Sequence, residues 1–279
     1  MLKELRAKTA IKPMLMMTAC ILCAVLVLTA CTDSRPNKSA VTEAEVKEMI
    51  IGRWIVADID GQPAMTNDKC VFTFTSADKA LISASFNARP ELGRQWIDQL
   101  EADVAVSGNK VTITRSANAK TTIVDELSVT GITADETIGD LVVKLMENGS
   151  ETIVSEGTIR LARVNIDCSE DILGMWEGRC TSEGSVFDDG ETHRWEYKAD
   201  GNYSYYVKNG DSWEVKNDLI NDYFVTGNLL CTRWGDNDHD DREWWEISIN
   251  GESMNWTALR SSEDGSTYTV TFEMTKVTE

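Results

Sequence analysis

Histidine is scarce in this sequence: His193 and His239 are the only two among 279 residues. A Ser-His-Asp arrangement needs an imidazole beside a positioned serine, and neither histidine lies in a nucleophile motif. Beyond residue 31 no two cysteines form a Cys-x-x-Cys pair, which with so few histidines argues against a zinc site. We therefore expect no catalytic site, no metal centre and no cofactor.

Positive charge is also in short supply, with 27 Lys and Arg against 46 Asp and Glu and a net charge of −19. Proteins bind nucleic acid through clustered Lys and Arg, and here these residues are scattered. Four basic residues and one acidic residue lie in the first 30 positions, so the chain without that stretch carries −22. We expect no nucleic-acid partner.

A run long enough to span a membrane is missing too. The apolar stretch from Met14 to Leu28 has about 15 residues, fewer than the roughly 20 that a spanning helix needs. Basic residues precede the stretch and small residues follow it, which is the layout of a secretory signal. An uncleaved membrane anchor is the alternative.

The end of this stretch, Leu28-Thr29-Ala30-Cys31, resembles the lipobox of bacterial lipoproteins. The resemblance implies that residues 1–30 are a signal peptide, that Cys31 carries lipid such as palmitate, and that this lipid holds the protein on a membrane of the cell envelope. Residues 31–40 are polar and predict a flexible tether. The periplasmic face and the outer surface both stay open as locations.

Four cysteines lie beyond the lipobox: Cys70, Cys168, Cys180 and Cys231. An even number in an exported protein is compatible with disulfides. A Cys180–Cys231 bond would close a loop of about 50 residues within the second half of the chain and stabilise it by a few kcal/mol. Buried free thiols are the alternative.

Residues 41–165 predict an antiparallel sheet led by a short helix. Thr42 is a candidate N-cap, Glu45 stands three residues on, and the apolar spacing from Val46 to Ile50 is helical. Gly108-Asn109 and Asn148-Gly149 are expected turns. The expected strands are 71–75, 102–106, 110–114, 140–145 and 158–164. Residues 90–100 have helix-like apolar intervals, so we expect one inserted helix there.

Residues 166–279 predict a second copy of this architecture. The pattern of Met49 to Trp54 recurs at Asp171 to Trp176, about 120 residues later. Turn dipeptides separate the segments after it: Asp200-Gly201, Asn209-Gly210, Asn250-Gly251 and Asp264-Gly265. The expected strands are 195–197, 203–207, 212–215, 223–225, 229–232, 243–249, 254–259 and 268–274. Short strands at such regular spacing favour a barrel or a sandwich.

The Gly-x-Trp at the first strand, the helical turn before it and the hairpins after it resemble the lipocalin pattern. More narrowly, the chain is similar to Bacteroidetes-type lipoproteins with lipocalin-like domains. This resemblance implies two tandem up-and-down β-barrels in which Trp54 and Trp176 pack across the closed ends. In the family an arginine near the last strand stacks on that tryptophan, and Arg160, Arg163 and Arg260 are the candidates here.

Acidic residues are densest from Asp236 to Asp241, an alternation that suggests calcium ligands. The comparison with an EF-hand fails, because Asp241 stands in place of the central glycine and Ile247 in place of the bidentate glutamate. A solvated loop between two strands is the better interpretation.

Seven of nine tryptophans lie from Trp176 onward, and aromatic rings can line a ligand cavity in a barrel. Core packing explains many of them equally well. Trp244 and Trp245 are adjacent in an expected strand, so one must face away from the core of its own domain, toward the first domain, a ligand or a partner.

We expect a lipid-anchored envelope protein that binds a small apolar or glycan-like molecule, or another envelope protein, without catalysis. A cavity of roughly 300 Å³ or more lined by Trp195, Tyr205 or Trp245 would favour ligand binding. A scaffold whose barrels are filled by their own side chains is the alternative. A hydrolase, the third class, would need a cleft with converging carboxylates of raised pKa.

Overall fold

The computed structural model describes residues 40–279 apart from 90–92, 186, 263 and 279. The expected signal peptide (1–30), the tether up to residue 39 and Cys31 lie outside these described residues. Residues 40–279 form one compact unit. In this part of the chain no helix is long and apolar enough to cross a membrane.

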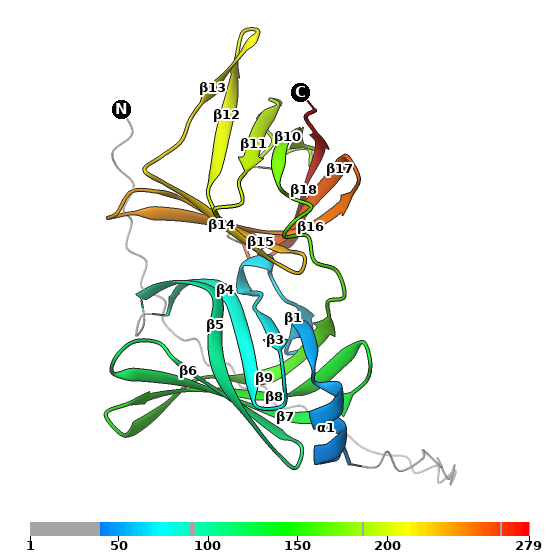
Figure 1. Ribbon diagram of the computed structural model, residues 1–279, viewed down its shortest axis with the longest axis vertical. Helices are drawn as coiled ribbons and strands as arrows, with labels where there is room; N and C mark the ends of the chain where they lie inside the picture. The colour runs from blue at the N-terminus through cyan, green and yellow to red at the C-terminus, as the bar shows by residue number, and fades with distance from the viewer. Residues whose placement is uncertain (1–39, 90–92, 186, 263, 279) are drawn as a thin grey trace, which may run out of the picture. The chain divides into compact units, whose positions relative to one another are not determined.

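The chain is mainly β, and its strands form two nine-stranded antiparallel sheets that share no ladder (Figure 1). The N-terminal sheet holds β1 (Gly52–Ile59), β2 (Gln62–Pro63), β3 (Val71–Phe74), β4 (Lys79–Arg89), β5 (Gly93–Ser107), β6 (Lys110–Ser116), β7 (Thr121–Ile132), β8 (Glu136–Glu147) and β9 (Ser150–Arg163). The C-terminal sheet holds β10 (Gly174–Cys180), β11 (His193–Tyr197), β12 (Tyr203–Asn209), β13 (Ser212–Val215), β14 (Ile220–Thr226), β15 (Leu229–Gly235), β16 (Asp240–Asn250), β17 (Ser253–Ser261) and β18 (Thr267–Lys276).

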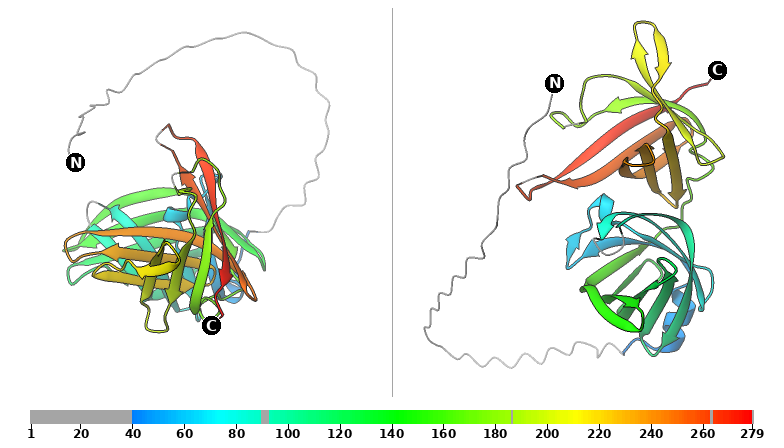
Figure 2. Two further views of the ribbon diagram at one scale, coloured as in Figure 1. Left: turned by 90° about the horizontal axis from the view of Figure 1, so that it is seen from above. Right: turned by 90° about the vertical axis from the view of Figure 1, so that its left-hand side faces the viewer.

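The N-terminal sheet is a closed barrel. Strand β1 pairs with β3 on one side and with β9 on the other, so eight strands, β1 and β3–β9, form a ring (Figure 2). Alternate residues of these strands point inward and fill the interior with apolar side chains, Trp54, Phe74 and Ile82 among them. The expectation of an antiparallel barrel is confirmed for this half of the chain.

The C-terminal sheet curls but does not close, which corrects the expectation of two barrels. Its strand order ends at β13 on one side and β14 on the other, and no ladder joins these edges. An isolated bridge, Asn202 to Asp222, links the two sides. Side chains also cross the gap: the Tyr223 hydroxyl donates to the Lys198 carbonyl at 2.7 Å. The sheet is therefore a partly open barrel whose two sides are linked around Asn202 and Tyr223.

Helix α1 (Glu43–Met49) begins as the sequence predicts. The Thr42 side chain accepts from the Glu45 N–H, and the Glu45 carboxylate accepts from the Thr42 N–H at 2.8 Å, which is a capping box. Val46 and Ile50 are buried in the barrel core, so the helix covers part of the barrel interior.

The two Gly-x-Trp segments have the same local structure. The Trp54 indole donates to the Ile50 carbonyl at 2.6 Å, and the Trp176 indole donates to the Ile172 carbonyl, also at 2.6 Å. Both rings are completely buried. Gly52 and Gly174 have positive φ values of 123° and 106°, a conformation that L side chains rarely adopt.

A cation lies over each of these rings. The Arg163 guanidinium is 4.2 Å from the Trp54 ring centre and donates to the Met49 carbonyl at 2.6 Å, so it also caps helix α1. Lys276 lies 5.1 Å from the Trp176 ring centre. Of the three arginines considered for stacking on a Gly-x-Trp tryptophan, Arg163 makes this contact, with Trp54. Arg260 does not, because it belongs to a different cluster described below.

The helix expected at residues 90–100 is wrong, because this stretch belongs to β5 wherever it is described. The pairing of β4 with β5 shifts register between Ile82 and Ala84, and Gln99 at the bulge has a φ of 49°. Because of the extra residue in β5, Ile97 lies opposite Ala84 and Leu100 lies opposite Ile82. Their three-residue spacing mimics a helix although the backbone is extended.

Of the two alternatives for Cys180 and Cys231, the structure has the buried free thiols and not the disulfide. Cys180 packs in the core inside the curled sheet, whereas Cys231 packs with Phe224 and Trp244 on the opposite face of that sheet. Two side chains on opposite faces cannot meet within bonding distance. Cys70 and Cys168 are buried as well.

The adjacent tryptophans of β16 point to opposite faces, as predicted. Trp245 lies in the core inside the curled sheet, and Trp244 lies in a separate apolar cluster on the outer face. That cluster includes Ile55 and Val71 of the N-terminal sheet, so the outward ring meets the first half of the chain.

Candidate ligand pocket in the C-terminal sheet

A cavity of about 410 Å³ lies inside the curled C-terminal sheet. Its lining comes from β11, β12, β14–β18 and the two loops that precede β11 and β14. The lining residues, here called the aromatic pocket, are Phe187, Asp189, His193, Trp195, Tyr203, Tyr205, Lys216, Asp218, Asn221, Thr232, Trp234, Glu243, Trp245, Trp256 and Phe272. This size is within the range of small-molecule sites, roughly 300–1,000 Å³.

The three residues that the sequence singles out for ligand binding, Trp195, Tyr205 and Trp245, all line this one pocket. Strand alternation explains the gathering, because side chains two residues apart share a face. Trp195 of β11 is the register partner of Tyr205 of β12, and their ring centres are 5.5 Å apart. Binding itself stays a prediction, whereas the gathering of the three rings is a feature of the structure.

The deep end of the pocket is aromatic and the rim is polar. Trp245, Trp256 and Phe272 are each no more than 6% exposed, and the Trp245 and Trp256 ring centres are 5.5 Å apart. Lys216 and Asp218 at the rim are exposed. The pocket therefore offers stacking surface inside and charged groups where solvent enters.

A hydrogen-bonded chain of three side chains lines one wall. The Tyr205 hydroxyl lies 2.7 Å from His193 Nδ1, and His193 Nε2 lies 3.0 Å from Asp189 Oδ2. With a neutral imidazole, Tyr205 donates to Nδ1 and the Nε2–H donates to Asp189. The chain orients the Tyr205 ring and fixes its hydroxyl as a donor to the imidazole.

The pKa shifts of Tyr205 and Asp189 indicate that these hydrogen bonds orient the Tyr205 side chain and do not activate it as a base or nucleophile. Burial raises the pKa of Tyr205, and the negative charges of Asp189 and Glu243 raise it further. Burial also raises the pKa of Asp189, but bonds from the Glu191 N–H and from His193 outweigh it and hold that pKa below its usual value. Tyr205 therefore stays protonated and Asp189 stays ionised near neutral pH.

Glu243 is the carboxylate set among the aromatic rings. It lies two residues before Trp245 on β16, and its Oε2 accepts a hydrogen bond from the Trp245 indole at 3.2 Å. Burial raises the pKa of Glu243, and the positive charge of Arg260 and the indole bond offset this only in part. Sequence reasoning missed this residue, although its position in phase with Trp245 places it on the inner face.

Arg260 approaches the same rings from β17. Its guanidinium carbon is 4.9 Å from the Trp245 ring centre, and its Nη2 donates to the Trp244 carbonyl at 2.9 Å. Its buried Nε has no hydrogen-bond partner among the described residues. Burial lowers the pKa of Arg260, while Glu243 raises it. Arg260 therefore stacks on Trp245, whereas the cation over Trp176 is Lys276.

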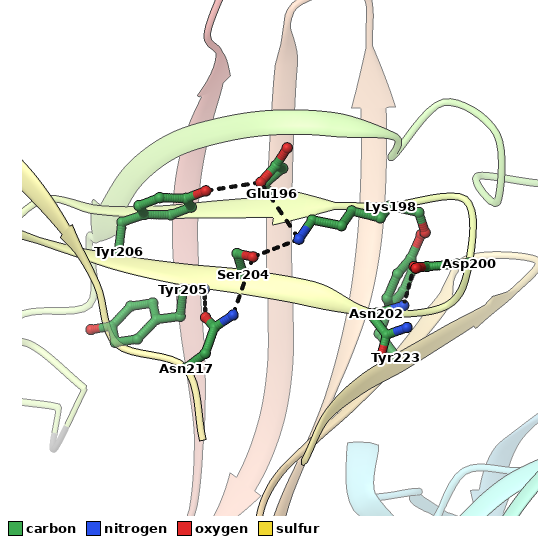
Figure 3. Close-up of polar contacts among 9 residues, drawn as sticks. All are labelled: Glu196, Lys198, Asp200, Asn202, Ser204, Tyr205, Tyr206, Asn217 and Tyr223. Atoms are coloured by element: carbon green, nitrogen blue, oxygen red, sulfur yellow. Dashed lines mark hydrogen bonds and ion pairs between the residues drawn. The ribbon is translucent and has the colours of Figure 1, made fainter. Parts of the chain in front are cut away.

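The start of β12, which the β13 ladder does not reach, is held in place by polar side chains (Figure 3). The Tyr205 N–H donates to Asn217 Oδ1 at 2.9 Å, and Asn217 Nδ2 donates to the Ser204 hydroxyl at 3.2 Å. Lys198 Nζ donates to the same hydroxyl at 2.8 Å. These bonds place the loop with Lys216 and Asp218 at the rim of the pocket.

The acidic stretch divides between the turn after β15, residues 236–239, and the start of β16, where Asp240 and Asp241 pair with Gly235 and Trp234. Asp236 Oδ1 accepts from the N–H groups of Asp238 and His239, at 2.9 and 2.8 Å. Within the described residues no three His, Cys, Asp or Glu side chains converge on a metal position.

Comparisons with known proteins place this chain in no family. No family model matches it, and no curated protein matches it. Among solved structures, a protein of unknown function from the DUF3598 family of Nostoc punctiforme is 11% identical, with 84% of this chain and 98% of that chain covered and a TM-score of 0.22. A protein with the working label AttH from Nitrosomonas europaea is 9% identical, with 80% and 91% covered and a TM-score of 0.23.

Proposed function

We propose that this chain is a lipid-anchored envelope protein whose C-terminal sheet binds a small organic molecule in the aromatic pocket. The observation that carries the proposal is the cavity of about 410 Å³ lined together by Trp195, Tyr205 and Trp245. A filled interior would have favoured a scaffold instead. The partly open sheet supports binding, because the gap between its end strands β13 and β14 leaves the interior accessible.

The ligand has an apolar or ring-shaped body that stacks on the aromatic walls, as an apolar metabolite or a glycan unit would. Native mass spectrometry of the protein purified from its source organism tests this directly. A retained non-covalent mass of a few hundred daltons, at one copy per chain, supports the proposal. Detection of only the lipidated chain, from several growth conditions, would argue for a scaffold.

The N-terminal barrel serves as a support in this account. Its interior is occupied by apolar side chains that include Trp54, Phe74 and Ile82. This arrangement fits the scaffold alternative for one half of the chain and a binding function for the other. Binding of an envelope protein through the barrel surfaces remains a second part of the proposal.

Membership of the lipocalin-like lipoproteins is part of the proposal as well. The buried Trp54 under Arg163 and the buried Trp176 under Lys276 support it. Lipidation at Cys31 is tested by radiolabelled palmitate, which should enter the protein and should be lost in the Cys31→Ser variant. Palmitate incorporation that persists in this variant would show that the lipid is attached at a residue other than Cys31.

A hydrolase is the second candidate, favoured by the raised pKa of Glu243 in a cleft. Hydrolysis by two carboxylates needs a free partner for Glu243. Asp189 is committed to His193 and to the Glu191 N–H at 2.9 Å, so it is poorly placed for that role. Turnover of aryl glycosides or esters that disappears in Glu243→Gln would establish the hydrolase and overturn a purely binding function.

A further inference from the structure

We propose that the molecule bound in the aromatic pocket is an organic cation, an amine or quaternary ammonium compound, whose charged group lies beside Glu243. This inference rests on the proposed binding function and adds the chemical class of the ligand. It follows from the charges that line the pocket, from the bonds that Glu243 lacks and from the aromatic walls.

The lining is negative. Three carboxylates, Asp189, Asp218 and Glu243, line the pocket against one ammonium, that of Lys216. The Lys216 Nζ is already bonded to Glu214 at 3.0 Å, outside the lining. The whole chain adds a net charge of −19, which raises the local concentration of cations at its surface.

Glu243 lacks a direct positive partner among the described residues. Its side chain accepts one hydrogen bond, from the neutral Trp245 indole, and no ion pair within 4.0 Å includes it in this part of the chain. The positive charge of Arg260 acts on Glu243, but its guanidinium is directed to the Trp245 ring and the Trp244 carbonyl. A carboxylate among aromatic rings is costly to ionise unless a cation compensates it, so a ligand cation would gain the most here.

The walls are suited to the same charge. Trp195, Tyr205, Trp245 and Trp256 line the pocket, and aromatic faces attract ammonium groups most strongly where water is excluded. Arg260 over Trp245, at 4.9 Å, shows that this cluster of rings already accepts one cation. A carboxylate together with several aromatic rings is the combination that binds ammonium groups in aromatic cages.

An anionic ligand fits poorly, because it would meet three carboxylates. A neutral sugar could stack on the rings and accept or donate hydrogen bonds at the rim, but it would leave the Glu243 charge uncompensated. The pocket therefore favours a positive charge over either alternative.

Isothermal titration calorimetry on the full mature chain tests the inference with matched probes. The probes are choline, its uncharged carbon isostere dimethylbutanol, benzylamine, benzyl alcohol and glucose. We expect choline or benzylamine to bind at one site per chain and at least about tenfold more tightly than its neutral counterpart, which is about 1.4 kcal/mol.

The Glu243→Gln variant keeps the shape of the side chain and removes its charge. It should weaken binding of the cation about tenfold or more and leave binding of the neutral probe within about twofold. Glu252→Gln, at an exposed turn between β16 and β17, removes the same charge outside the pocket and should leave both affinities unchanged.

The outcomes separate this inference from the proposed function. Equal binding of charged and neutral probes, unchanged in Glu243→Gln, would overturn the cation and leave a small-molecule pocket. Preferential binding of glucose would identify a glycan site and overturn the cation likewise. Binding of none of the five probes would count against the cation, and the mass-spectrometric result on the source protein would then decide the proposed function by itself.

Discussion

At the scale of single residues, the two buried tryptophans carry the argument for a repeated architecture. Each indole donates to the carbonyl four residues before it, and each ring lies under a cation from the last part of its own sheet. Removing one indole N–H leaves a buried carbonyl without its partner, and the smaller ring leaves a cavity.

Trp54→Phe and Trp176→Phe should each lower the free energy of unfolding by about 1–3 kcal/mol. Urea unfolding followed by circular dichroism measures this as a lower midpoint at an unchanged slope. Trp213→Phe is the matched control, because Trp213 lies in β13 and is only half-buried, with Arg194 over its ring. An effect of Trp213→Phe equal to the other two would contradict the role assigned to the buried pair.

Glu243 links the pocket to the pH dependence of stability. Its pKa is raised in the folded state by burial, with Asp241 adding to the shift and Arg260 and the Trp245 indole opposing it. The folded state therefore holds this proton more tightly than the unfolded state, and the charge costs stability once the pH rises through the folded pKa.

Replacing Glu243 with Gln should accordingly stabilise the ligand-free protein near pH 7. The gain should vanish at about pH 4 and below, where both states carry a protonated carboxyl. Urea midpoints of the two proteins across this range provide the measurement. A variant that is less stable than the parent near pH 7 would show that Glu243 is compensated in the folded protein.

At the scale of elements, the β-turn dipeptides and the period of two locate most strands correctly. All eight expected strands of the second half lie within β11–β18, because Gly201, Gly210, Gly251 and Gly265 hold positive φ values in the turns between them. The expected strands of the first half are likewise found in β3, β5, β6, β8 and β9.

The strands that sequence reasoning missed have identifiable causes. In β7 the buried alternation runs through Asp125, which is tolerated because Arg115 of β6 pairs with it inside the protein. In β4 and β5 the bulge at Gln99 changes which residues share a face. Ion pairs and bulges depend on the neighbouring strand, and that information is absent from a local pattern.

The pocket could be predicted only in part, because a local pattern contains alternation along one strand and not the pairing between strands. Trp195, Tyr205 and Trp245 follow from composition and alternation, and Glu243 would follow from its spacing to Trp245. The Asp189–His193–Tyr205 chain needs the register of β11 against β12 and the path of the preceding loop. The missing ladder between β13 and β14 also depends on pairing that the sequence does not display.

Helix α1 depends on its capping box. Thr42→Ala removes the side-chain acceptor of the Glu45 N–H and should destabilise the protein by about 1 kcal/mol. Glu48→Ala, at an exposed position of the same helix, should change stability by less than about 0.5 kcal/mol. Thermal unfolding of the two variants side by side distinguishes the cap from general helix propensity.

The edge of β12 should open when Asn217 is replaced. In Asn217→Ala the Tyr205 N–H loses its acceptor, so its amide hydrogen should exchange about tenfold faster or more. Amides in the N-terminal barrel should keep their exchange rates. Asn255→Ala, on the exposed face of β17, is the control and should leave Tyr205 unchanged. Unaltered exchange at Tyr205 in Asn217→Ala would mean that the neighbouring backbone pairing alone holds this edge.

At the scale of the whole molecule, one closed and filled barrel accompanies one open sheet with a cavity. The difference lies in strand pairing, since β1 pairs with β9 whereas no ladder joins β13 to β14. Apolar side chains fill the interior of the closed barrel, whereas the open sheet has a cavity lined by aromatic rings. The central functional proposal is therefore that the C-terminal sheet binds the ligand and the N-terminal barrel supports it.

The most direct test is a crystal structure of the protein purified from its source organism without added ligands. The account predicts density for one non-protein molecule in the aromatic pocket, in contact with Trp195 and Trp245 and with a positively charged group near Glu243. A pocket filled by water alone or closed by its own side chains would contradict the account.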